Sequence, residues 1–213
     1  ILASSHDNYF YVWDVRKGAI PITKIVAHSA RVNGIDWSRN SASKIISCSN
    51  DETVKFWDYN KDMNEPQYTI RTNFPVNRAR HVPFGDYCCG IMPLRGGDNS
   101  IYIVDYKDQK GESPLIPVHT FKGHSEPVKE FLWRSRHTLN SSVDDREFQL
   151  VTWSKDCDLR LWPVDDNIYR KLNYVRNKPL PDGKKLIDFK YRTYGNEPID
   201  PNIKINGDAF AIN

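Results

Sequence analysis

The chain has 213 residues with 30 basic and 27 acidic side chains, a formal net charge of +3, and 12% aromatic residues. This weak and mixed charge gives no electrostatic reason to expect specific nucleic-acid binding. No apolar stretch approaches the roughly 20 residues that a membrane-spanning helix needs. The aromatic content favours a β-rich domain over a helical one. Because the sequence begins at Ile1 inside a repeat, we expect a fragment of a longer protein.

The four cysteines predict a reduced compartment rather than a disulfide framework. Cys48, Cys88, Cys89 and Cys157 show neither CxxC nor Cys/His metal spacing. We therefore expect no metal, no cofactor and a cytoplasmic location. Adjacent Cys88 and Cys89 predict one buried and one exposed thiol, because successive side chains of a strand point to opposite faces.

One spacing recurs along the chain. An aspartate stands six positions before a tryptophan at Asp7–Trp13, Asp51–Trp57 and Asp156–Trp162, and six before a valine at Asp98–Val104. The spacing lies within a longer unit of four short runs, rich in β-branched and aromatic residues, that are separated by turn-forming residues. Trp13 and Trp57 stand 44 positions apart, which is the period of a four-stranded propeller blade.

The repeat predicts the following elements in chain order. We expect a partial blade over 1–18, blades over 20–60, 66–107 and 116–164, and a linker or loosely packed extension over 165–213. The blade over 66–107 is degenerate, and the polar stretch 136–147 within the last blade predicts an exposed loop.

The unit resembles the WD-repeat (WD40) family, whose repeats carry Gly-His early and Trp-Asp late. The early mark stands at 27–28 (AH) and 123–124 (GH), and the late mark at 13–14 and 57–58, while the last copy ends Trp162-Pro163. The resemblance covers residues 1–164. It implies an all-β propeller fold, here the C-terminal half of a seven-bladed ring with about three and a half four-stranded blades.

The resemblance also implies a hydrogen-bond network inside each regular blade. In the family, the turn aspartate reaches a histidine before the first strand, the histidine pairs with a strand hydroxyl, and that hydroxyl accepts the tryptophan N–H. The implied sets are His28, Ser47 or Ser49, Asp51 and Trp57, and His124, Thr152 or Ser154, Asp156 and Trp162. Such a network would satisfy every buried polar group.

A serine, a histidine and an aspartate also suggest a hydrolase triad. The sequence has no GxSxG nucleophile elbow, and two triads in one chain would be unusual. We therefore interpret both sets as structural.

The third unit, 66–107, lacks two members of the network. Thr72 and His81 stand at positions of a histidine and a tryptophan in the regular unit, and Val104 replaces the late tryptophan, while Asp98 persists. Joint loss is expected if the histidine and the tryptophan serve one network, because removing either one leaves the polar group of the other buried without its hydrogen-bond partner. We expect this blade to be held by apolar packing alone.

Three stretches, 74–106, 119–134 and 149–164, go beyond generic WD repeats. Together they resemble the family of WD repeat-containing protein 59, a subunit of the SEA complex, called GATOR in animals. The resemblance implies a non-enzymatic scaffold in a coat-like complex that regulates TOR kinase signalling in response to amino acids. It also implies other WD-repeat propeller subunits as partners, a vacuolar or lysosomal membrane surface as location, and neither a specific nucleic acid nor a small-molecule substrate.

Propellers of this kind usually bind partners through rim residues. The corresponding positions are Arg31, Asn33, Asn50, Asn77, Arg78, Arg80, Lys129 and Lys155, although each could equally be a solvated surface group. An alternative function is a receptor for an acidic or phosphorylated peptide, with Arg31, Arg78 and Arg80 as the anion pocket. A chromatin- or RNA-associated propeller is a third possibility, suggested only by the basic character of the chain.

Overall fold

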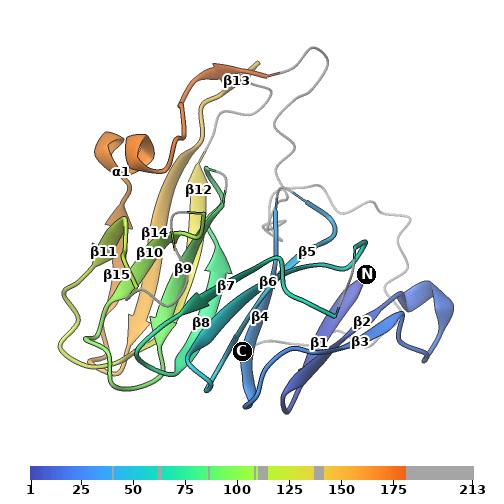
Figure 1. Ribbon diagram of the computed structural model, residues 1–213. Coiled ribbons are helices and arrows are strands. Elements are labelled where there is room, and N and C mark those ends of the chain that lie inside the picture. The colour runs from blue at the N-terminus through green and yellow to red at the C-terminus, as the bar shows by residue number, and fades with distance from the viewer. Residues whose placement is uncertain are drawn as a thin grey trace, which may run out of the picture.

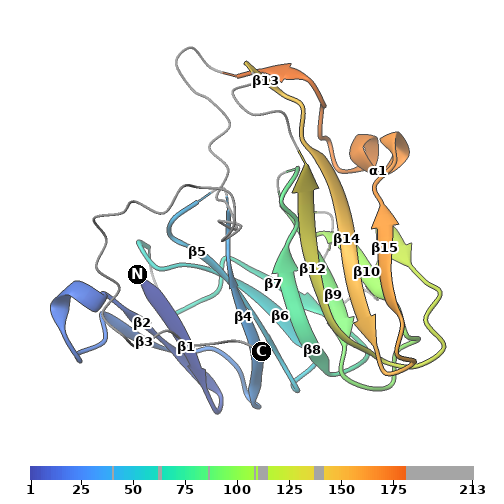
Figure 2. The ribbon, with the colours of Figure 1, turned by 180° about the vertical axis from the view of Figure 1, so that it is seen from behind.

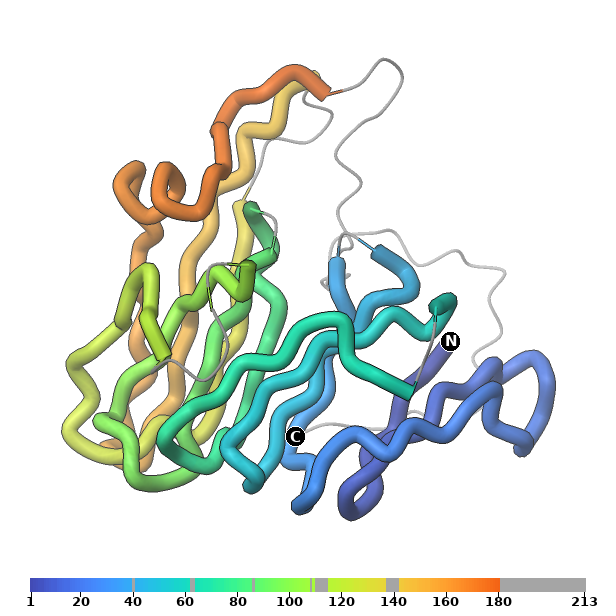
Figure 3. The backbone as a smooth tube through the Cα atoms, in the orientation of Figure 1, coloured from blue at the N-terminus to red at the C-terminus, as the bar shows by residue number. Residues whose placement is uncertain are grey.

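Four antiparallel sheets stand side by side in an arc (Figure 1). The computed structural model describes residues 1–39, 41–61, 64–85, 87–107, 109, 115–136 and 142–180. Colour advances steadily along the arc in Figure 3, so the chain builds the sheets in sequence order. The predicted all-β architecture of propeller blades is confirmed.

The strands are grouped as follows. The first sheet holds β1 (Leu2–His6), β2 (Tyr9–Trp13) and β3 (Thr23–Val26); the second holds β4 (Val32–Trp37), β5 (Lys44–Ser49), β6 (Thr53–Asp58) and β7 (Tyr68–Arg71). The third holds β8 (Val76–His81), β9 (Cys88–Pro93), β10 (Ile101–Asp105) and β11 (His119–Phe121); the fourth holds β12 (Val128–Arg136), β14 (Glu147–Ser154) and β15 (Leu159–Pro163). A 3-10 turn η1 (Val15–Lys17), helix α1 (Asp166–Lys171) and the short pair β13 (Val143–Asp144) and β16 (Lys178–Pro179) complete the described elements.

The predicted blade boundaries are wrong by one strand. The first run of each repeat pairs backwards with the preceding sheet, as the partners Phe10↔Ile25, Val54↔Ile70 and Ile101↔Phe121 show. The reason is that β3, β7 and β11 come next in the chain after β2, β6 and β10 and turn back to pair with them antiparallel. Each sequence repeat therefore contributes strands to two successive sheets and links those sheets covalently.

Apolar cores lie between successive sheets rather than on one face only. In β5, Ile45 packs toward the first sheet and Ile46 toward the third, because alternate side chains point to opposite faces. Cys88 and Cys89 divide in the same way between two cores. Both thiols are buried, so the prediction of one exposed thiol is wrong: a sheet between two others has no solvent face.

The inner strands of the last three sheets share one irregularity. Pairing shifts by one residue just after Val32, Val76 and Val128, which marks a β-bulge at the same repeat position each time. A bulge re-aims the side chains beside it and increases the local twist. The bulge residues Asn33, Asn77 and Lys129 are all positions of the predicted interaction rim.

The segment after β15 packs against the sheets, as Figures 1 and 2 show for α1 at the end of the fourth sheet. Asp165 caps α1 by accepting the Ile168 N–H at 2.8 Å, and Ile168, Tyr169 and Leu172 are buried. The prediction of a loosely packed extension is therefore wrong for residues 165–174, where Ile168, Tyr169, Leu172 and Tyr174 pack into the core between the third and fourth sheets.

The same segment explains part of the predicted 136–147 loop. Val143 and Asp144 form β13 and pair with Lys178 and Pro179 of β16. This stretch is a short ribbon rather than a free loop, because the returning chain supplies it with a partner strand. Residues 137–141 and 181–213 lie outside the described residues.

Candidate functional site

The second sheet contains a chain of buried polar contacts. His28 enters from the loop before β4, and its Nδ1 lies 3.0 Å from the carboxylate of Asp51 in the β5–β6 turn. Its Nε2 lies 2.8 Å from the Ser47 hydroxyl on β5, and the Trp57 indole N–H donates to the same hydroxyl at 2.9 Å. Every polar group in the chain of contacts thus has a partner, as burial requires.

The fourth sheet repeats this arrangement with threonine in place of serine. His124 Nδ1 lies 2.9 Å from Asp156, and its Nε2 lies 2.7 Å from the Thr152 hydroxyl. The Trp162 indole N–H donates to Thr152 Oγ1 at 2.8 Å. We call the two sets the second-sheet and fourth-sheet staples.

The structure separates the alternative hydroxyls that the sequence left open. Ser49 donates to the Ala30 carbonyl at 3.1 Å, and Ser154 donates to the Glu126 carbonyl at 2.8 Å. Both also accept the N–H of the turn aspartate two positions on. They fix the turn backbone and stand outside the staples.

The staples hold their aspartates ionised. Burial would raise the pKa of Asp51, but hydrogen bonds from His28 and Thr53 outweigh it and hold the pKa well below its usual range. Desolvation is likewise outweighed at Asp156, where the Asp158 N–H and His124 lower the pKa.

The second-sheet staple has the connectivity of a Ser-His-Asp triad, but its serine is not a usable nucleophile. Ser47 is 0% exposed, and its oxygen already accepts the Trp57 N–H while facing His28. A substrate carbonyl could not reach that oxygen without unpacking the sheet, so the geometry is that of a structural bond network.

The third sheet replaces the staple with other polar contacts. Asp98, the turn aspartate, accepts a hydrogen bond from the Tyr102 hydroxyl and lies 3.0 Å from Lys122 Nζ. Thr72, at the position of His28, donates to the Phe74 carbonyl at 2.6 Å. The third blade therefore has polar contacts beside its apolar core, and that apolar packing alone holds it stays a prediction.

An ion network joins the inner strands of the last three sheets. Arg78 and Arg80 on β8 both pair with Glu130 on β12, at 3.2 and 3.1 Å. Arg78 also donates to the Asn33 carbonyl on β4 at 2.6 Å. Burial would raise the pKa of Glu130, but the Phe131 N–H and Arg80 lower it further than that. Two cations of the predicted anion pocket, Arg78 and Arg80, already share the Glu130 carboxylate, which argues against that prediction.

The remaining rim residues fall into two groups. The Asn33 amide donates to Asn50 at 2.8 Å and to the Val76 carbonyl at 2.7 Å, and the Asn77 carbonyl accepts from the next residue at 2.9 Å, so the three asparagines have internal partners. The three other predicted positions are exposed and carry no side-chain hydrogen bond or ion pair within the described part of the chain: Arg31, Lys129 and Lys155. The free cations of the predicted rim are these three.

Sequence reasoning missed an aromatic cluster at the opposite end of the sheets. Phe84, in the loop after β8, lies with its ring centroid 4.7 Å from Phe148 and 5.1 Å from Tyr169 of α1. Gly85 follows with φ +72°, and a Cβ there would stand 2.5 Å from the Leu172 carbonyl oxygen. The Pro-Phe-Gly stretch is thus the surface against which α1 packs. The sequence pattern gave no sign of this role, because it depends on where the chain after β15 folds back.

Within the ranges given above, no group of three or more His, Cys, Asp or Glu side chains could hold a metal ion. No helix within those ranges is long and apolar enough to cross a membrane.

The arc of sheets and the staples define the class of protein. The family model "WD domain, G-beta repeat" matches residues 20–58, which run from just before β3 to the end of β6. The chain carries a WD40 repeat over these residues, and the WD-repeat resemblance predicted from its sequence marks is confirmed.

Particular relatives narrow this class. The chain is similar to "Maintenance of telomere capping protein 5" of Saccharomyces cerevisiae, 51% identical over 203 residues, which are 93% of this chain and 17% of that protein. It is also similar to "GATOR2 complex protein WDR59" of Homo sapiens, 35% identical over 170 residues, which are 79% of this chain and 16% of that protein. The Drosophila melanogaster protein of the same description is 35% identical over 172 residues, 80% of this chain and 17% of that protein. The chain spans about a sixth of the length of these relatives.

Proposed function

We propose that this chain is the propeller part of a non-enzymatic scaffold subunit in a complex of the GATOR2 or SEA type. The observation that carries the proposal is the 35% identity to GATOR2 complex protein WDR59 over most of the chain. The buried staples support a structural role for the Ser, His and Asp sets, since the second-sheet serine is enclosed. The partners would be other propeller subunits, and the role would be amino-acid-dependent control of TOR kinase signalling.

The proposal places the protein at the vacuolar or lysosomal membrane surface, held there through its complex. Arg31, Lys129 and Lys155 are the rim cations best suited to a partner or an anionic surface, because no internal acid neutralises them in the described part of the chain.

Mass spectrometry of the proteins that co-purify with the tagged full-length protein tests the proposal. We expect other WD-repeat subunits of a GATOR2-type complex, and weaker recovery after Arg31→Glu, Lys129→Glu and Lys155→Glu together. A matched control reverses three exposed cations that follow β2, β6 and β15 at the opposite ends of the sheets: Lys17, Lys61 and Arg170. Recovery of telomere proteins, ubiquitin ligase cores or histones in place of such subunits would overturn the proposal.

A further inference from the structure

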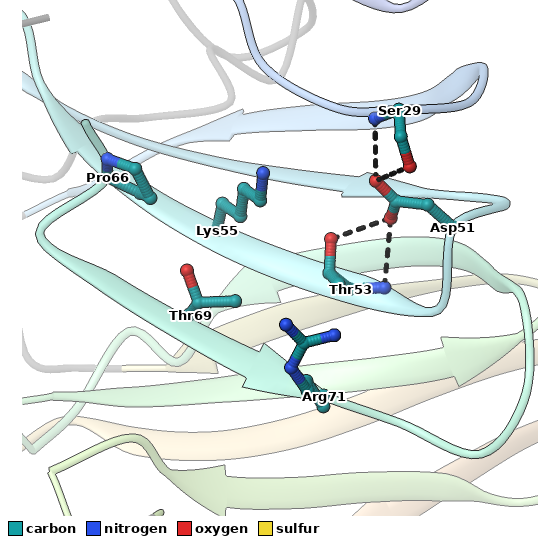
Figure 4. A pocket seen from close by; sticks show the side chains of 7 residues that line it. All are labelled: Ser29, Asp51, Thr53, Lys55, Pro66, Thr69 and Arg71. Carbon is teal, nitrogen blue, oxygen red and sulfur yellow. Dashed lines mark hydrogen bonds between the residues drawn. The ribbon is translucent and has the colours of Figure 1, made fainter. Parts of the chain in front are cut away.

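A groove with a volume of about 430 Å³ lies between the outer strands of the second sheet and the segment that follows β3. Its polar wall, drawn in Figure 4, comprises Ser29, Asp51, Thr53, Lys55, Thr69 and Arg71. Thr53 and Arg71 are cross-strand partners, as are Lys55 and Thr69. These four side chains therefore share one face of the sheet and point into the groove.

The groove carries two cations, Lys55 and Arg71, that form no ion pair with an acid among the described residues. The Lys55 ammonium donates to the Ala27 carbonyl at 2.7 Å, which leaves two of its three N–H groups for a ligand. Arg71 is exposed and makes neither an ion pair nor a side-chain hydrogen bond within the described residues. The Thr69 hydroxyl, likewise exposed, lies beside them.

The third sheet explains why Arg71 is unpaired. Lys122 follows Phe121 of β11 as Arg71 follows Ile70 of β7, and Lys122 pairs with the turn aspartate of its sheet at 3.0 Å. In the second sheet, the turn aspartate Asp51 is already engaged. Its oxygens accept from the neighbouring side chains and backbone of the staple. The Asp51 oxygens thus face the staple and Ser29, and Asp51 forms no ion pair with Arg71 within the described residues.

We propose that this Lys55–Arg71 groove binds a phosphorylated segment of a partner protein. A phosphate monoester matches the site because it offers a charge near −2 and three acceptor oxygens to a guanidinium, an ammonium and a hydroxyl. Asp51 lies at the Thr53–Arg71 end of the groove, so the phosphate lies on the side away from Asp51, where Lys55, Thr69 and the Arg71 guanidinium border the groove.

The shape of the site favours a protein segment over a membrane. The cations lie in a recess beside Asp51 rather than on a flat basic surface, which is a poor match to anionic headgroups. β7 is the outer strand of its sheet, and its unpaired edge suits an extended chain lying alongside it. The inference rests on the proposed role as an interaction scaffold but not on the identity of the complex.

Fluorescence anisotropy on the purified full-length protein tests the groove, using labelled phosphoserine and phosphothreonine peptides with randomised flanks. Unphosphorylated copies are the matched ligands. We expect the phosphorylated peptides to bind at least about tenfold more tightly, and Arg71→Gln and Lys55→Met each to lose about tenfold, as charge-assisted hydrogen bonds predict. Lys122→Gln, which removes the corresponding cation of the third sheet, should leave binding unchanged. Thermal melting shows that each variant is folded.

Three results would overturn the inference: equal binding of both peptide forms, retained binding after both groove substitutions, or binding only to vesicles containing phosphoinositides. Co-purification from the Arg71→Gln protein separates this inference from the proposed function. If GATOR2-type subunits are recovered while the wild type ignores phosphopeptides, the groove is wrong and the proposed function stands. If phosphopeptides bind while the subunits are absent, the groove stands and the identity of the complex is wrong.

Discussion

The second and third sheets are built to one plan but stabilised differently. The second uses a buried staple from His28 through Ser47 to Trp57, whereas the third buries Val104 at the tryptophan position. The third sheet also has the Phe84 cluster, which packs against α1. Because α1 follows the last repeat, part of this sheet's apolar core comes from outside the repeats. The comparison teaches that a blade can lose its polar network when another apolar element supplies equivalent burial.

The largest effect is expected from removing the packing that the third sheet gained. Phe84 is 1% exposed and contacts aromatic rings from the fourth sheet and α1. Phe84→Ala should lower the free energy of unfolding by roughly 3–5 kcal/mol, the usual cost of a large buried cavity. Urea denaturation followed by tryptophan fluorescence measures it, with Phe84→Leu as a milder control. A loss below about 1 kcal/mol would show that α1 is not an integral part of the fold.

The next effect concerns the second-sheet staple. Ser47→Ala should cost roughly 2–3 kcal/mol, because it leaves the Trp57 N–H and His28 Nε2 buried without a partner. Ser47→Thr is the matched control, since Thr152 performs the same task in the fourth sheet. The interpretation of the staple would be wrong if Ala and Thr variants melted alike.

A smaller effect is expected from pH, through His81. This residue of the third sheet stands at the position that Trp37 takes in the second sheet. Burial, with a smaller contribution from Lys44, lowers the pKa of His81 to about 4 from its ordinary value of 6.5. A proton therefore prefers the unfolded chain, so stability is full above pH 6.5 and is lost as the pH falls from 6.5 toward 4. Between pH 7 and 5.5 we expect a loss of about 1.2 kcal/mol.

The variant His81→Leu isolates this effect. Burial also lowers the pKa of His119, but His119 titrates in both proteins, so the difference between their stability–pH curves reports His81. Parallel curves from pH 7 to 5.5 would contradict the buried, neutral state of His81.

The resemblance to WD repeats could predict the staples, because the turn and strand lengths of the repeat fix the spacing of the staple residues. It could not choose between Ser47 and Ser49, which lie two positions apart on one strand face, since the choice depends on where Trp57 ends across the sheet. It misjudged Arg78 and Arg80 because their partner Glu130 lies on a strand about 50 positions away. A residue's position within its repeat can be predicted from the sequence pattern, whereas contacts between residues of different repeats can be identified only from the folded structure.

The smallest effect tests the polar contact that replaced the third sheet's staple. Lys122 and Asp98 are 71% and 41% exposed, whereas His28 and Asp51 in the second sheet are 0% and 9% exposed. A double-mutant cycle with Lys122→Met and Asp98→Asn should give a coupling below about 1 kcal/mol, because water screens the pair. A coupling as large as the loss in Ser47→Ala would mean that the third sheet had exchanged one strong network for another. A small coupling would instead assign its stability to Phe84 and α1, and would make the tail the true substitute for the missing staple.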